Sequence, residues 1–132
     1  MMMAMHDKKI TMMCYYDARL GHSVYAGLFN PLTYKPFCTY YSFKAFGNLY
    51  ALENQAEVTG DITAGLYALA ATNGKERGIL ITNIGEDKDV ETNLDSSYTV
   101  YAIDEKHFMT KKRLNLKSFK LKKYETIYVE KK

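Results

Sequence analysis

Residues that mark common functional sites are scarce in this chain of 132 residues. It has no Trp and only two Cys, too few for a disulfide framework, and Cys14 and Cys38 lack the spacing of a zinc site. Because both cysteines lie among apolar residues, we expect them to be buried free thiols. The sequence therefore predicts no metal and no cofactor.

Motifs for catalysis, nucleotide binding or membrane insertion are missing as well. The glycine-containing turns fit neither a P-loop nor a dinucleotide fingerprint, and no serine lies in a nucleophile elbow. His6, His22 and His107 share no metal-ligand spacing. Apolar runs never reach 18 residues, and residues 1–5 are cut short by charge before they form a signal-peptide core. We expect a soluble, cytoplasmic chain without membrane contact.

Charge is distributed unevenly along the chain. Residues 106–132 hold ten Lys or Arg against two Glu, whereas residues 1–105 hold eight against thirteen acids. A basic segment raises nucleic acid or an acidic protein as a partner. Its lysines alternate, however, with apolar residues such as Phe119, Leu121 and Ile127, which is typical of the solvent side of a strand. We therefore expect no nucleic-acid binding.

Aromatic residues are plentiful, with 12 Tyr and 6 Phe, and the first half of the chain predicts a helix, a strand and a second helix. Residues 1–8 are helix formers. Residues 10–16 are an apolar run of strand length without polar alternation, which predicts a strand buried on both faces. A loop with Gly and Pro follows. From Pro36 to Glu53 apolar residues recur at steps of three and four, which predicts a helix.

The apolar period changes to two after Gly65. The β-prone runs are separated by turn clusters and cover residues 66–71, 78–84, 90–94, 98–103, 108–114 and 126–129. We predict a mainly β fold, an antiparallel β-sandwich of about six to eight strands. The polar stretch from Asn54 to Asp61 divides the chain into a strand–loop–helix part, residues 1–56, and the sandwich, residues 57–132.

Five residues around the first loop are candidates for ligand contact. Asp17 and Arg19 stand two positions apart at the end of the predicted strand, so both side chains point the same way. They are suited either to binding hydroxyl groups or to a salt bridge that holds the loop. Tyr16 and Tyr25 flank the loop and suit stacking on a sugar ring, although such tyrosines also fill cores. His22 lies in the same loop. Nothing completes a nucleophile, a base and an orienting group, so we predict no catalytic residue.

These stretches resemble a known group of enzymes. The similarity lies in Met12 to Arg19, Gly27 to Asn30, Lys35–Pro36 and Tyr40 to Phe46. It is to the C-terminal part of clan A glycoside hydrolases, in particular family 39 (β-xylosidase and α-L-iduronidase) and the arabinofuranosidases. The resemblance implies that residues 10–16 and 36–53 are the last strand and helix of a (β/α)8 barrel and that residues 1–8 end the preceding helix. It also implies that Asp17 and Arg19 lie near the sugar.

The resemblance further implies that the chain is inactive by itself. Retaining glycosidases use two carboxylates about 5 Å apart, and in this clan they come from the fourth and seventh barrel strands, which this sequence does not contain. We expect a C-terminal fragment or accessory domain that supports the barrel and contacts sugar. A stand-alone carbohydrate-binding module and a protein-interaction sandwich with a basic C-terminal segment stay open. The expected partners are a glycan, a second copy of the chain or a missing barrel.

Overall fold

A computed structural model of the chain describes residues 2–5, 8–15 and 27–132. It contains two helices, α1 (Met2–Met5) and α2 (Cys38–Tyr50). The strands are β1 (Asn54–Ala56), β2 (Leu66–Thr72), β3 (Arg77–Asn83), β4 (Lys88–Glu91), β5 (Thr99–Ile103), β6 (Phe108–Lys111), β7 (Ser118–Leu121) and β8 (Thr126–Lys131). No helix among the described residues is long and apolar enough to cross a membrane.

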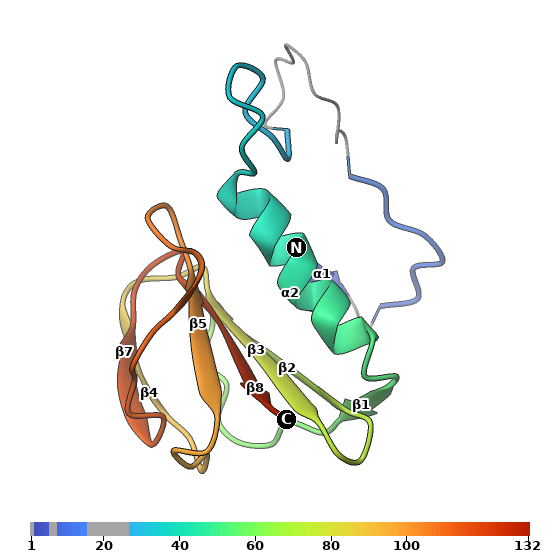
Figure 1. The fold of residues 1–132 in the computed structure, drawn as a ribbon. Coiled ribbons are helices and arrows are strands. Elements are labelled where there is room, and N and C mark those ends of the chain that lie inside the picture. The colour runs from blue at the N-terminus through green and yellow to red at the C-terminus, as the bar shows by residue number, and fades with distance from the viewer. Residues whose placement is uncertain (1, 6–7, 16–26) are drawn as a thin grey trace.

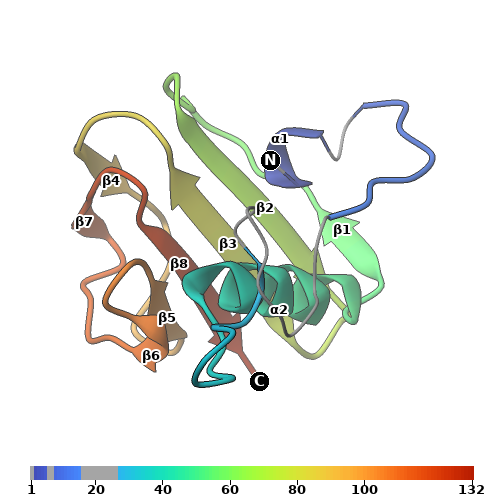
Figure 2. The same cartoon turned by 90° about the horizontal axis from the view of Figure 1, so that it is seen from above.

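The strands form two antiparallel sheets. Six of them follow the order β1-β2-β3-β8-β5-β6, and β4 pairs with β7 in a small second sheet. Helix α2 lies across one face of the large sheet, and β4 and β7 lie on its other side (Figure 1). Seen from above, α1 lies beside β2 (Figure 2), where the Thr82 hydroxyl is 3.4 Å from the Met3 sulfur. The structure confirms the predicted mainly β, antiparallel fold.

Helix α2 is attached to the sheet by one apolar stripe. Ala45, Leu49 and Leu52 follow one another at helical spacing, and all three are buried. They pack against side chains such as Leu80 of β3 and Tyr128 of β8. The helix is therefore an integral part of the core.

The opposite face of the large sheet forms a second core with the small sheet. Ile127 and Val129 of β8 are fully buried there against Phe119 and Leu121 of β7, whereas Tyr128, between them in sequence, points to the helix. Successive side chains of a strand point to opposite faces. Strand β8 is therefore buried on both sides, as a central strand between two covering layers should be.

The predicted strand at residues 10–16 is wrong for its described part. Residues 10–15 contain no strand, and residues 10–14 are exposed, so the expectation that Cys14 is buried is also wrong. An apolar run becomes a strand only where neighbouring strands take up its backbone hydrogen bonds. Among the described residues no strand pairs with it, and pattern alone does not reveal whether such a partner exists.

The other boundaries agree more closely. Each of the six predicted β runs overlaps an observed strand, and α2 is shorter than predicted at both ends. Strands β1 and β7 were not among the predicted runs, because Asn, Gln, Ser and Lys are poor strand formers. Strand β1 lies in the first predicted part of the chain but pairs with β2 in the second. The division after residue 56 stays a prediction.

Candidate functional site

The five residues predicted to contact a ligand lie outside the described residues. They are Tyr16, Asp17, Arg19, His22 and Tyr25, within residues 16–26. Just before them, the Tyr15 ring packs edge-on against Phe43 of α2, with ring centroids 5.0 Å apart. After them, Phe29 contacts Tyr40 of α2 at 5.5 Å. Both ends of the segment are therefore attached to α2, and the assignment of a sugar site to it stays a prediction.

A cluster of two tyrosines and a carboxylate lies on the α2 side of the sheet, with Tyr128 buried and the other two half-buried. The hydroxyls of Tyr101 and Tyr128 donate to the two oxygens of Glu130, at 3.0 and 3.4 Å, and Asn48 of α2 hydrogen-bonds the Tyr128 hydroxyl. Burial, and then Glu130, raise the pKa of Tyr128 to about 12. Burial likewise raises the pKa of Tyr101. Both hydroxyls therefore act as neutral donors rather than as acids or bases at neutral pH.

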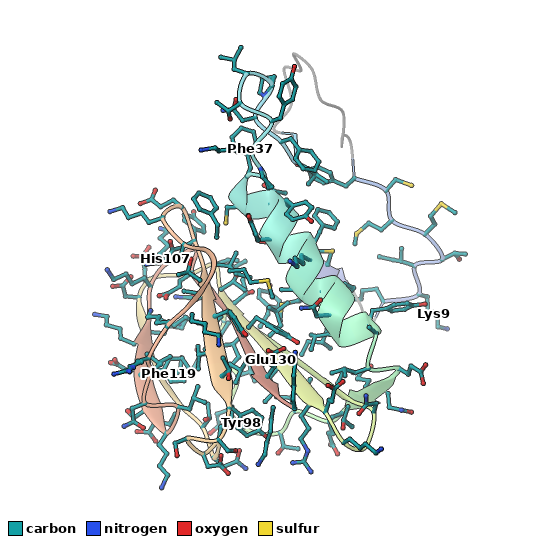
Figure 3. All side chains as sticks on the ribbon, viewed as in Figure 1. Lys9, Phe37, Tyr98, His107, Phe119 and Glu130 are labelled. Atoms are coloured by element: carbon teal, nitrogen blue, oxygen red, sulfur yellow. The ribbon has the colours of Figure 1, made fainter. Side chains whose placement is uncertain are left out.

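A small pocket of about 240 Å³ opens beside this cluster, between the C-terminal half of α2 and the ends of β3 and β8. Arg77 and Lys132 line it together with Glu130, which Figure 3 labels on the sheet. The Glu130 carboxylate is already bound by two hydroxyls and lies 3.9 Å from the Lys132 ammonium. The pocket thus lies at the junction of the helix and the sheet, and its Glu130 carboxylate is already engaged by other side chains.

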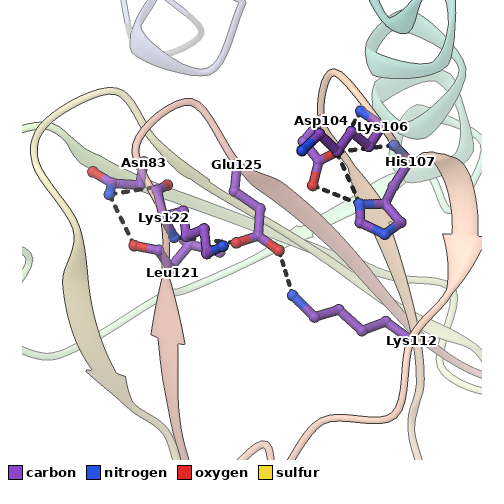
Figure 4. A network of polar contacts seen from close by, with 8 residues as sticks. All are labelled: Asn83, Asp104, Lys106, His107, Lys112, Leu121, Lys122 and Glu125. Atoms are coloured by element: carbon purple, nitrogen blue, oxygen red, sulfur yellow. Dashed lines mark hydrogen bonds and ion pairs between the residues drawn. The ribbon is translucent and has the colours of Figure 1, made fainter.

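The turn between β5 and β6 brings Asp104 and His107 together near the start of α2. His107 Nδ1 lies 2.7 Å from an Asp104 oxygen, as Figure 4 shows. Partial burial raises the pKa of Asp104, but hydrogen bonds from His107 and from two backbone N–H groups outweigh it and hold this pKa below its ordinary value. Burial, and then Asp104, raise the pKa of the Cys38 thiol. A protonated thiol is a poor nucleophile, so this grouping does not make a cysteine active site.

The described residues contain no candidate metal site. Among residues 2–5, 8–15 and 27–132, no group of three or more His, Cys, Asp or Glu side chains is arranged to hold a metal ion.

The basic residues near the C-terminus are spread over several ion pairs. Lys112 Nζ lies 2.5 Å from Glu125, which is 4% exposed. Other lysines pair with the β3–β4 turn: Lys123 with Glu86 at 2.7 Å and Lys120 with Asp87 at 3.6 Å. These contacts tie strands and turns together, and the absence of a nucleic-acid partner stays a prediction.

A groove of about 510 Å³ lies at the C-terminal end of α2, beside β1 and β2. Leu49, Leu69 and Ala71 form part of its apolar lining. Its polar residues follow one another at the end of the helix: Tyr50, Glu53, Asn54 and Gln55. The sequence does not predict this site, in which Tyr50 is 83% exposed.

Comparisons with known proteins find similarity in structure. No family model matches the chain, and no curated protein matches it. The glycoside hydrolase family 30 subfamily 8 xylanase Xyn30A from Clostridium acetobutylicum aligns with a TM-score of 0.60 and 17% identity, over 79% of this chain and 30% of the xylanase. A family 30 endoxylanase from Clostridium papyrosolvens C71 aligns with a TM-score of 0.58 and 15% identity, over 78% and 30%.

These likenesses concern the fold alone. The aligned part of the chain spans about 30% of either xylanase, and both xylanases belong to family 30, so the finer resemblance to family 39 and the arabinofuranosidases stays a prediction. The chain shares its fold with part of each of these two xylanases.

Proposed function

We propose that the chain is a non-catalytic accessory domain of a glycoside hydrolase, in which α2 joins the β-sandwich to a barrel. The observation that carries the proposal is the two-sided character of α2. One side packs on the sheet through Ala45 and Leu49, and the other carries aromatic residues such as Tyr40 and Phe43. A helix that faces solvent on its outer side is normally polar there.

The aromatic outer side of α2 needs a cover. Short segments of the chain touch it through Tyr15 and Phe29, but Phe37, labelled at the start of the helix in Figure 3, is exposed. The two similar structures are described as xylanases, and about 70% of each lies outside the alignment. A barrel in that remaining part would supply the cover, and a second copy of this chain is the alternative occupant.

Site-specific cross-linking tests this proposal. A photo-reactive phenylalanine analogue is placed at position 43, on the outer side of α2, and in a control protein at Tyr124, which is exposed on the β7–β8 turn. We expect position 43 to cross-link in cells to a barrel polypeptide with glutamates at strand ends, identified by mass spectrometry. Equal cross-linking at the two positions contradicts the proposal.

The sugar contact predicted for residues 16–25 belongs to the same proposal. Asp17→Asn and Arg19→Gln should weaken binding of xylo-oligosaccharides to the chain joined to its barrel and leave its unfolding temperature unchanged. A lower unfolding temperature with unchanged binding would instead support the salt-bridge alternative.

A further inference from the structure

The groove at the end of α2 combines an aromatic side chain with unpaired polar groups. Tyr50 leaves the helix at its last turn and is 83% exposed. Asn54 and Gln55 line the same groove and are exposed. Among the described residues, no side-chain hydrogen bond engages any of these three. They are therefore free to bind a ligand without breaking a contact of the fold.

Glu53 adds a carboxylate at a position where the backbone does not favour it. Its φ is +69°, and this left-handed conformation after a helix is normally taken by Gly. A residue with a Cβ is strained there. Glu53 nevertheless lines the groove, as the only charged residue of its lining.

The chemistry of the lining selects the class of ligand. A carboxylate accepts hydrogen bonds from hydroxyl groups, and amides both donate and accept them. A tyrosine ring offers an apolar face to the C–H face of a sugar. With one negative charge and no Lys or Arg in the lining, the groove disfavours anions. Its volume of about 510 Å³ falls in the range of small-molecule sites.

We infer that this groove is a binding site for neutral oligosaccharides, with Tyr50 stacking on one sugar ring and Glu53, Asn54 and Gln55 binding hydroxyl groups. It goes beyond the proposed function, which assigns no ligand to the residues of this groove.

Isothermal titration calorimetry of the full chain provides the test, with xylohexaose, cellohexaose and maltohexaose as neutral probes and hexagalacturonate as an anionic probe. We expect saturable binding of at least one neutral probe and none of the anionic one. Tyr50→Ala should weaken binding at least about tenfold through loss of stacking. Tyr50→Phe keeps the ring and should stay within about threefold. Tyr124→Ala removes an equally prominent tyrosine away from the groove and should change nothing.

Glu53→Gly separates a binding role from a folding role. Gly relieves the left-handed backbone and removes the carboxylate, so we expect a higher unfolding temperature together with weaker sugar binding. Two results overturn the inference: silence of all neutral probes at about 10 mM, well above a weak Kd of about 1 mM, or unchanged binding in Tyr50→Ala. Cross-linking at position 43 reports on the barrel partner independently, so the two proposals can fail separately.

Discussion

Gly78 of β3 and Leu49 of α2 approach each other so closely that a Cβ at position 78 would lie 2.7 Å from Leu49 Cδ2. The same Cβ would lie 3.1 Å from Leu52 Cδ1 and 3.4 Å from the Tyr128 hydroxyl oxygen. Because Leu49 is buried, it has little room to move. The missing side chain of Gly78 therefore sets the distance between helix and sheet.

Gly78→Val should lower the free energy of unfolding by about 2–3 kcal/mol, because the added carbons overpack this contact. Chemical denaturation monitored by circular dichroism measures the change. Gly47→Ala is the matched control, since Gly47 lies within α2 and a Cβ there would meet nothing within 4 Å. It should stabilise the protein by up to about 1 kcal/mol. Equal effects of the two substitutions would contradict the assigned role of Gly78.

Tyr128 should make the fold sensitive to alkali. Its pKa is about 12 in the folded chain against 10.0 ordinarily, so the unfolded chain loses this proton first. The stabilising contribution is complete below pH 10 and is lost as the pH rises toward 12. Between pH 9 and pH 11 we expect a loss of about 1 kcal/mol. The Tyr128→Phe variant should not show this part of the loss. Urea unfolding at pH 9 and pH 11 measures the change in the free energy of unfolding, and an equal change in both proteins would refute the role of Tyr128.

The Lys112–Glu125 ion pair predicts a strong asymmetry between single and double variants. Glu125 also accepts the Lys122 backbone N–H at 3.1 Å. Lys112→Met should cost about 2–3 kcal/mol, because it leaves a buried carboxylate without its cation. Adding Glu125→Gln should recover most of that cost. Thermal unfolding of the parent, the two single variants and the double variant measures the coupling, and strictly additive effects would show that the pair contributes little.

Asn83 should be one of the most sensitive polar residues of the sandwich. It is fully buried, donates to the carbonyls of Leu121, Lys122 and Glu86, and accepts the Gly85 backbone N–H. Figure 4 shows its contact with the end of β7. Asn83→Ala should cost about 2–4 kcal/mol, since buried carbonyls lose their donor.

Asn115→Ala serves as the control for Asn83. Asn115 is exposed and accepts one backbone N–H, from Lys117. We expect a change within about 0.5 kcal/mol in denaturant titrations. A similar cost at both positions would mean that burial of Asn83 does not decide its contribution.

The sequence predicts those elements whose pattern reflects their own packing. Ala45, Leu49 and Leu52 are spaced as a helix requires. In β8 the apolar side chains of successive residues fill the two cores on either side of the sheet. Strand β1 was missed because its Asn and Gln are poor strand formers and its pairing with β2 decides its structure. The run at residues 10–15 misled for the converse reason, since its apolar pattern predicts partner strands that the described residues do not supply.

The candidate groove was beyond sequence reasoning because it has no local motif. Its lining comes from α2, β1 and β2. Tyr50 and Leu69 are far apart in sequence and meet there only in the folded chain. Glu53 is unusual because it is an acid at a helix end that favours Gly. This becomes visible only with its backbone angle, which the sequence does not display.

The place of β8 in the sheet also determines when the protein is able to fold. This strand lies between β3 and β5 but follows every other strand in sequence. A ribosome adds about 5–20 residues per second, and until residues 126–131 emerge, β3 and β5 each present an unpaired edge. Such edges are prone to pair with other chains. The nascent protein therefore depends on β8 to close this sheet, and protection of the two open edges until β8 pairs with them becomes the step that decides its yield.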